Sequence, residues 1–471
     1  MLPAPRNYAI YPSVFLADQK SEVIIAPTER AFLLFEGEEY LVTVYAINTD
    51  QHDYHFGIIG TEYRVTAQGG IVRFTHTFAG EQQHLVTFAK GDKKLGEFMV
   101  YSLLEDLYEL TPLRGDLHGH SYRSDGARDP AALAGHYREQ GYDFFALTDH
   151  NRFYPGFEID EVYAGVKLGI TRVPGEEVHA PGSSIHIVHV GGRESVALKY
   201  IKERDTFEAE VEEYRKQIPA GITENYHDRY AKAMWACDKI HEAGGLAIFA
   251  HPFWRPKDRV YNVCDEFAKI LLTSGKFDVY ELVGGMKQTG INRSVAMWND
   301  LRVEGLKISV VGSSDVHGLR EPSTFPHLFT VCFAKSNTPE DIIDAVKNGR
   351  SVAVEACGTE NERQYRAYGS LRLVSYAQFL LSYYFPARMR ICQSEGPAMR
   401  AYAMGEADAA LVEALAEQSN SFRARFFGRM APHLPDATML KQEDRWRARH
   451  LADGPITKGS AIDAQKPNLQ I

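Results

Sequence analysis

The sequence predicts an α/β protein with an all-β segment before its α/β part and a helical segment after it. Three observations lead there: apolar and polar residues alternate up to about residue 110, amphipathic stretches alternate with short apolar runs from about 113 to 357, and helical patterns dominate after 360. A chain of 471 residues is long enough for two or three domains. We therefore expect domains at 1–112, 113–357 and 358–471.

The first segment has the pattern of an antiparallel sheet with one buried face. "EYLVTVYAI" and "GIVRFTHTF" alternate apolar and polar residues, and "DQHDYHFG" and "AKGDKKLG" supply residues typical of turns. These runs predict a small β-sandwich, from which "LLEDLYELTPL" leads into the second segment.

The central segment repeats a helix followed by a buried strand. In its first unit, Asp129 is a helix N-cap, Pro130 takes the first helical position, Gly141 ends the helix, and the apolar run "FFALT" follows. The same order recurs in "RYAKAMWACDKIHEAGG" with "LAIFA", in "SVAMWNDLRVEG" with "KISVVGSS", and in the capped helix "TPEDIIDAVKNGR". Units of this length predict a parallel α/β sheet or barrel.

The last segment changes character again. "LRLVSYAQFLLSYYF" and "GEADAALVEALAEQSNSFRARFFGRM" have helical patterns, whereas "LADGPITKGSAIDAQKPNLQI" is typical of a disordered or loosely docked tail. Aromatic side chains in the first of these helices suit either a cover over the α/β part or contact with a second copy, so a homo-oligomer is compatible with the sequence.

Composition restricts the classes of function. The net charge of −10 argues against stable nucleic-acid binding, and no apolar run approaches the roughly 20 residues of a membrane span. The five cysteines form no CxxC pair, which predicts reduced thiols rather than a disulfide framework or a thiolate metal site. The N-terminus lacks the pattern of a signal peptide. We expect a cytoplasmic protein.

Histidines and carboxylates follow successive apolar runs of the central segment. The stretch "RGDLHGHSYRSDG" contains His118 and His120, whose alternate positions on an extended chain let both imidazoles reach one ion. Other polar motifs are "LTDH", "PGEE", "SSIHIVHV", "FAHPFW" and "SSDVHG". In parallel α/β folds the loops after the strands gather at one end of the sheet, so these side chains are expected to converge there on a metal site.

The ordered set HxH, SDG, TDH, PGxE, H, AHP and SDxH resembles the PHP (polymerase and histidinol phosphatase) superfamily over residues 113–357. The resemblance implies a distorted (β/α)7 barrel of PHP type with two or three divalent ions at its mouth. It also implies metal-dependent hydrolysis, most often of phosphoesters. A sibling branch that attacks carbamates and related esters carries a stretch similar to "GEEV".

The resemblance also assigns metal ligands. His118, His120 and Asp315 would bind a first ion, Glu177 would bridge it to a second ion held by His186 and His251, and Asp125, His150 and His317 would hold a third. Glu176 competes with Glu177, and His179 and His189 compete with His186. Asp125 stands where some relatives have histidine. Imidazole and carboxylate donors without thiolate suit Zn²⁺, Mn²⁺ or Fe²⁺.

Four further side chains are candidates for catalytic roles. Asp149 is placed to accept a hydrogen bond from a ligand imidazole or to cap the turn after it. Arg123, Arg152 and Arg255 adjoin the metal loops and could clamp a phosphate, although each could also be a solvated surface arginine.

The leading hypothesis is a metal-dependent phosphoesterase that cleaves a small phosphorylated metabolite or nucleotide with metal-activated water. One alternative is a carbamate, ester or amide hydrolase that uses the same cluster. The other is a non-catalytic binding protein on a PHP scaffold.

Overall fold

The computed structural model shows two compact units, one formed by residues 104–424 with 1–2, and the other by residues 3–103 and 425–471. The described residues are 7–50, 52–53, 57–319, 324–358 and 364–452. The predicted tail from 451 onward lies almost wholly outside them. Residues 358–424 belong to the same unit as the predicted α/β segment, while the three-domain division stays a prediction.

The N-terminal part of the smaller unit is all-β, as the alternating pattern predicts. Its three-stranded sheet has the order β1 (Tyr8–Tyr11), β3 (Lys20–Pro27), β8 (Val72–Thr77). Its five-stranded sheet has the order β2 (Val14–Leu16), β10 (Lys93–Leu103), β9 (Gln82–Lys90), β4 (Glu39–Ala46), β7 (Thr61–Thr66). β5 (His52–Asp53) pairs with β6 (Gly57–Ile58).

Both sheets of this unit contribute to one apolar core. On β4 the side chains of Tyr40, Val42 and Val44 point inward, and they belong to the same buried cluster as Ile25 of β3 and Phe74 of β8. A short 3-10 helix, η1 (Arg30–Phe32), and helix α13 (Ala437–Ala452) complete the unit. The period-2 pattern thus has the physical cause expected of it, a sheet with one buried face.

The larger unit is a mixed α/β structure with two sheets. The six-stranded sheet has the order β13 (Thr171–Val173), β12 (Phe144–Ala146), β11 (Thr111–Asp116), β19 (Leu328–Ala334), β20 (Ser351–Cys357), β21 (Gln364–Tyr368). The five-stranded sheet has the order β14 (Gly175–Val178), β15 (Ile187–Val190), β16 (Leu246–Phe249), β17 (Val279–Val283), β18 (Ser309–Gly312).

Hydrogen bonding therefore gives two half-barrel sheets where we expected one barrel of parallel strands. β11 and β12 are parallel, but β15 is antiparallel to both of its neighbours, and β19 is antiparallel to β11 and β20. The two sheets nevertheless enclose a common interior, because Leu113 and Phe144 of one and Val188 and Ile248 of the other lie in a single buried cluster.

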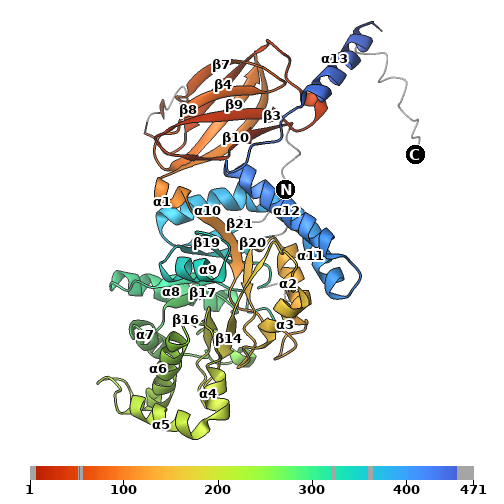
Figure 1. Ribbon diagram of the computed structural model, residues 1–471. Coiled ribbons are helices and arrows are strands. Elements are labelled where there is room, and N and C mark those ends of the chain that lie inside the picture. Colours follow the sequence, from red (N-terminus) through yellow and green to blue (C-terminus); the bar gives the residue numbers. More distant parts are fainter. Residues whose placement is uncertain (1–6, 51, 54–56, 320–323, 359–363, 453–471) are drawn as a thin grey trace, which may run out of the picture. The chain divides into compact units, whose positions relative to one another are not determined.

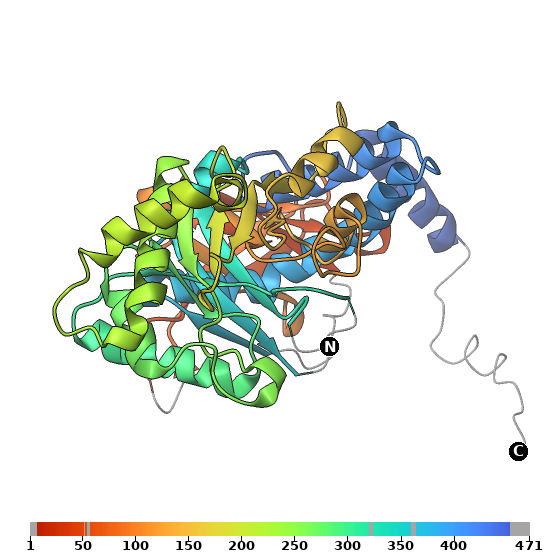
Figure 2. The same ribbon diagram turned by 90° about the horizontal axis from the view of Figure 1, so that it is seen from below.

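Helices cover these sheets (Figure 1). Their bounds are α1 Glu105–Tyr108, α2 Pro130–Glu139, α3 Pro155–Val162, α4 Ala197–Lys202, α5 Arg204–Arg215, α6 His227–Glu242, α7 Asp265–Thr273, α8 Gln288–Val303, α9 Pro339–Lys347, α10 Leu371–Tyr383, α11 Phe385–Ala403 and α12 Ala409–Phe426, with 3-10 turns at Glu224–Tyr226 and Pro256–Asp258. Helices α6, α7 and α8 pack on the five-stranded sheet, where Trp235, Leu271 and Trp298 join its outward-facing Phe249 and Tyr280 in one core (Figure 2).

The predicted local signals act as expected in α2 and α9. The Asp129 side chain accepts a hydrogen bond from Ala132 N, and Thr338 accepts one from Asp341 N, so each helix begins at a capped residue followed by proline. Gly141 takes a left-handed φ of 81° after α2, a conformation that glycine adopts at little cost.

A buried ionic network joins the C-terminal helices to the six-stranded sheet. Arg388 of α11 places Nη2 2.5 Å from Oδ1 of Asp143, and Arg423 of α12 pairs with the same oxygen. Arg138 of α2 and Glu395 of α11 form a second pair, with Nη2 and Oε2 2.6 Å apart. Because all of these except Arg423 are almost fully buried, their charges depend on one another rather than on water.

The seam between β18 and its neighbours β19 and β20 is closed by side chains. The Thr330 hydroxyl of β19 accepts a hydrogen bond from Gly312 N at 3.1 Å and donates one to Gly312 O at 2.8 Å. The Ser351 hydroxyl of β20 donates to Val310 O at 2.8 Å. Two hydroxyl groups thus take the place of a backbone ladder here, and they fix where β18 ends.

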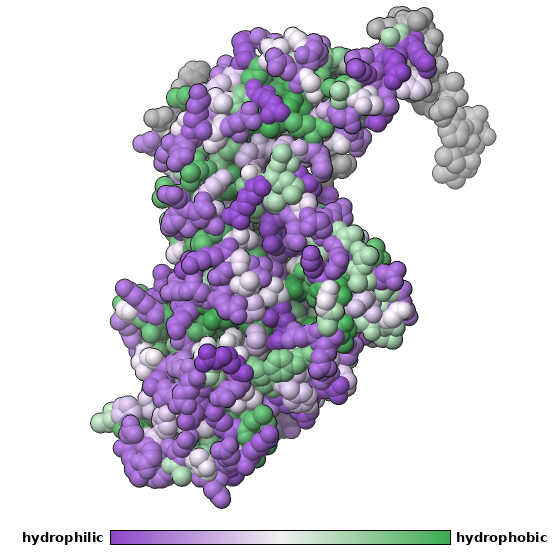
Figure 3. Space-filling model, viewed as in Figure 1, coloured by the Kyte–Doolittle hydropathy of each residue, from purple (hydrophilic) through white to green (hydrophobic). Residues whose placement is uncertain are grey.

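None of the helices in the described ranges combines the length and the hydropathy that a membrane crossing requires. The face shown in Figure 3 is mostly hydrophilic, with hydrophobic residues in small groups.

Candidate metal centre

The predicted metal ligands meet at one end of the two sheets of the larger unit. His118 and His120 follow β11, His150 follows β12, and His251 follows β16. Two isolated parallel bridges, Gly119 to Val316 and His150 to Glu177, join these loops beyond the strand ends. Because β15 is antiparallel, its first end lies at this edge, and His186 therefore reaches the site from before a strand, where we expected every ligand to follow one.

Glu177 and Glu176 point in opposite directions from β14. Glu177 faces the histidines, whereas Glu176 accepts hydrogen bonds from the backbone of Val196 and Ala197 at the start of α4. His189 also lies on the far side, with Nδ1 3.4 Å from Glu176 Oε1. Alternation of side chains along the strand explains this separation, which the sequence alone left open.

The carboxylate of Glu177 lies at the centre of six imidazoles. Its Oε1 is 2.9 Å from a nitrogen of His186, 3.2 Å from one of His251 and 3.3 Å from one of His179. Its Oε2 faces the other three: the nearest nitrogens of His150, His120 and His118 lie at 2.7, 3.4 and 3.5 Å. A fully buried carboxylate with imidazoles around both oxygens has the arrangement of a ligand that bridges two cations.

Asp315 is the second carboxylate of the cluster. Its Oδ1 lies 2.9 Å from His120 Nε2 and 3.3 Å from His118 Nε2, so these three residues form one candidate group of donors. Asp315 has a left-handed φ of 52°, which is rare for a residue with a side chain. Such local strain is typical of positions that the surrounding structure holds in place for function.

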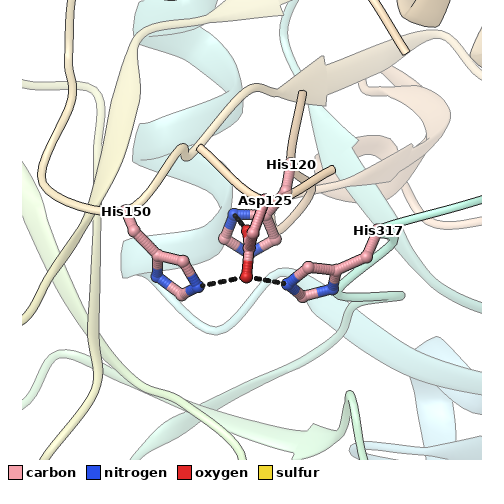
Figure 4. Close-up of side chains that lie close together, drawn as sticks. All are labelled: His120, Asp125, His150 and His317. Atoms are coloured by element: carbon pink, nitrogen blue, oxygen red, sulfur yellow. Dashed lines mark ion pairs between the residues drawn. The ribbon is translucent and has the colours of Figure 1, made fainter. Parts of the chain in front are cut away.

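Asp125 gathers a further group of three histidines, drawn in Figure 4. Its Oδ2 lies 3.3 Å from both His150 Nε2 and His317 Nε2, and its Oδ1 lies 3.9 Å from His120 Nδ1. Burial lowers the pKa of His150, but the Asp125 and Glu177 carboxylates raise it to about 10. The carboxylates of this group therefore attract positive charge, which a divalent cation can supply as well as a proton.

Buried polar atoms without partners show that cations fit this cluster. His118 Nε2, His150 Nδ1, His186 Nδ1 and Glu177 Oε2 have no partner in hydrogen-bond geometry, although oxygen and nitrogen atoms face each other within 3.5 Å. Such groups are costly to bury unless something binds them. Donors that each lie about 2.1 Å from one ion are roughly 3 to 3.4 Å apart, which matches these separations.

Glu281, within β17, is a site residue that we did not predict. Its buried carboxylate accepts a hydrogen bond from His118 Nδ1, 2.8 Å away, and one from His251 N at 3.2 Å. This contact turns His118 Nε2 toward Glu177 and Asp315 and fixes the tautomer. A charged residue inside the otherwise apolar run "VYELV" is the signal that could have identified it.

We expect Glu281→Gln to weaken divalent-metal binding by about 10- to 100-fold, because His118 loses the carboxylate that orients it. Competition with a chromogenic chelator measures the change. The matched control is Glu355→Gln, which alters another nearly buried glutamate that pairs with Arg366 and should leave metal affinity unaltered. Equal affinities for wild type and Glu281→Gln would remove this role.

Asp149 does not contact an imidazole in the hydrogen bonds that the structure describes. Its Oδ1 accepts from Ser121 N at 2.8 Å and from the Ser124 hydroxyl at 2.7 Å, while its Oδ2 accepts from the Ser121 hydroxyl at 2.7 Å. Asp149 therefore braces the loop that carries His120 and Asp125. Its expected bond to a ligand imidazole is replaced by this contact.

The three candidate arginines differ in position. Arg123 pairs with Glu158, with Nη2 and Oε2 2.9 Å apart, and Arg152 is exposed beside Tyr154. Only Arg255, among these three, lines the pocket at the metal cluster, and its guanidinium donates to the carbonyl oxygen of Arg259. Of the three, Arg255 is thus the one placed to meet a substrate.

That pocket has a volume of about 450 Å³ and opens onto the cluster. Asp125, His150, His251 and Asp315 form its polar floor. Its walls are Phe253, Trp254, Met286, Arg255, Lys287 and Asp258. The pocket therefore combines a donor-rich floor with an aromatic wall and two cationic side chains at its margin.

Comparisons with known proteins give distant similarities. No family model matches the chain. The chain is 26% identical over 212 residues to a 5′-3′ exoribonuclease from Haemophilus influenzae, a match that covers 34% of this chain and 74% of that protein.

The similar solved structures overlap with the chain only in part. One is a two-domain protein from Bacteroides vulgatus that contains a PHP-like metal-dependent phosphoesterase, with 18% identity, a TM-score of 0.35, and coverage of 55% of this chain and 76% of that one. Another is an amidohydrolase from Chromobacterium violaceum with bound sulfate, with 19% identity, a TM-score of 0.31, and coverage of 44% and 88%. By motif, and among the proteins that it matches, the chain resembles PHP-like metal-dependent phosphoesterases.

Proposed function

We propose that the protein is a metal-dependent phosphoesterase that hydrolyses a small phosphorylated molecule. The observation that carries this proposal is Glu177, a buried carboxylate with three imidazole nitrogens within 3.3 Å of one oxygen and three within 3.5 Å of the other. This is the arrangement by which one side chain can hold two cations together.

The donors fall into groups that would hold two or three ions. His118, His120 and Asp315 form one group, His186 and His251 serve a second together with Glu177, and His120, Asp125, His150 and His317 form another. The set contains nitrogen and oxygen donors without thiolate, which suits Zn²⁺, Mn²⁺ or Fe²⁺.

Divalent ions at these positions would lower the pKa of a water molecule toward neutrality and neutralise charge on a phosphoryl group. The chain's own residues do the rest. Glu281 keeps Nε2 of His118 turned toward the cluster, and Asp149 holds the loop of His120 and Asp125. Arg255 and Lys287 at the pocket margin supply positive charge for an anionic substrate, and Trp254 offers it an apolar wall.

Removal of metal provides the test. We expect protein treated with a chelator to lose about a thousandfold of its rate on nitrophenyl phosphate or bis-nitrophenyl phosphate, because bound ions contribute several kcal/mol to stabilising the transition state. Addition of Mn²⁺ or Zn²⁺ should restore the rate.

A naphthyl carbamate, assayed beside the two phosphoesters, separates phosphoester hydrolysis from the alternative suggested by "GEEV". Turnover of the carbamate alone would contradict the proposal while leaving a metal-dependent hydrolase. Less than one ion per chain after metal supplementation would point to a non-catalytic binding protein.

A further inference from the structure

His179 brings an additional imidazole to the metal centre, beyond the nine ligands that the motifs assign. It lies one residue past β14 and shares the inward face of the chain with Glu177, two positions earlier. Its Nε2 is 3.3 Å from Glu177 Oε1 and is buried without a partner in hydrogen-bond geometry. The ring centroids of His179 and His186 are 3.7 Å apart, and those of His179 and His150 are 4.4 Å apart.

The backbone at His179 is held in place by Asn151. Asn151 N donates to Glu177 O at 2.8 Å, and its Oδ1 accepts from His179 N at 2.8 Å. The Tyr200 hydroxyl also donates to this Oδ1, and Asn151 has a left-handed φ of 55°. Asn151 therefore clamps the end of the strand that carries both Glu177 and His179, which is what precise orientation of two ligands requires.

The Oε1 side of Glu177 is short of donors without His179. The motif-based set gives this side His186 and His251, whereas the other oxygen and Asp315 are surrounded by more nitrogens. With His179, three imidazole nitrogens lie within 3.3 Å of Oε1. Three imidazoles and a carboxylate make a donor set of the kind that Zn²⁺ binds in proteins.

We propose that His179 is a metal ligand that acts together with His186 and His251 on the Oε1 side of Glu177. This inference rests on the proposed function only in that the centre must bind divalent ions. His179 and His186, which compete for one position in the motif, then both bind.

Metal affinity measured without any substrate tests this role. We expect His179→Ala to bind one Zn²⁺ about 10- to 100-fold more weakly than wild type in chelator competition, with the remaining ions bound as before. Replacement by Co²⁺ gives a second readout, because its visible absorption depends on the nitrogen donors, and the spectrum of His179→Ala should differ from that of wild type. His241→Ala is the matched control, since His241 pairs with Asp278 on a helix away from the cluster.

Added imidazole separates a ligand from a residue that merely packs. In His179→Ala, free imidazole should enter the vacated space and restore Zn²⁺ affinity, and His179→Gln should show the same loss with less change in packing. Wild-type affinity and spectrum in both variants would overturn the proposal, and so would a loss that imidazole does not repair. If wild type itself bound no divalent ion, the proposed function would fail along with this inference, whereas failure of the variants alone would leave the function intact.

Discussion

Replacement of Glu177 by glutamine should abolish hydrolysis and release metal from the centre. Glutamine has nearly the same shape, but it lacks the negative charge that both oxygens present to the six surrounding imidazoles. We expect a loss of at least about a thousandfold in kcat/KM, because a bridging carboxylate supports several kcal/mol of charge stabilisation and each 1.4 kcal/mol is a factor of ten. Elemental analysis of the purified variant should show fewer ions per chain.

The neighbouring residue provides the control for this experiment. Glu176→Gln makes the same chemical change one position away, on the opposite face of β14, where Glu176 binds the start of α4. This variant should keep its metal and its activity and lose only some thermal stability. If Glu177→Gln retained wild-type turnover and metal content, the centre described here would not be the site of hydrolysis.

Asp143→Asn should destabilise the larger unit by about 3–5 kcal/mol. The change leaves the buried guanidinium of Arg388 without the carboxylate that faces it at 2.5 Å, and removal of one partner from a buried ion pair costs this much. Chemical denaturation measures the free energy of unfolding. Glu304→Gln is the control: it disrupts the exposed Glu304–Lys269 pair and should cost less than about 1 kcal/mol.

Acid should reveal the same interaction. Burial raises the pKa of Asp143, but Arg388 and Arg423 lower it more, so that it lies below the ordinary value of 3.8. A lowered folded-state pKa means that the stabilisation is present at neutral pH and is lost as the pH falls below about 4. Wild type should therefore lose more stability between pH 6 and pH 3 than Asp143→Asn does. Parallel acid curves for the two proteins would show that Asp143 carries no such charge interaction.

Local features were predictable because their causes are local. The cap at Asp129, the proline at position 130 and the stop at Gly141 act within one helix, and the pattern predicted that helix well. Convergence of His118, His251 and other ligands followed from the rule that loops after parallel strands meet at one edge.

Features that depend on topology or distant contacts were not predictable in this way. The choice between Glu176 and Glu177 needs the register of β14, and His186 arrives before an antiparallel strand, a direction that no local pattern in the sequence reveals. Asp143 has nothing in its own neighbourhood that announces Arg388 and Arg423, because these partners come from helices near the end of the larger unit.

The two hydroxyl groups that close the seam at β18 have a consequence for genetics. Asp315 lies only three positions beyond Gly312, so its place depends on Thr330, a residue on a strand that donates nothing to the cluster. A screen for inactive mutants would then recover substitutions at Thr330 beside those of true ligands. Sensitivity to mutation at that position would report the alignment of a distant carboxylate and not contact with a reacting molecule.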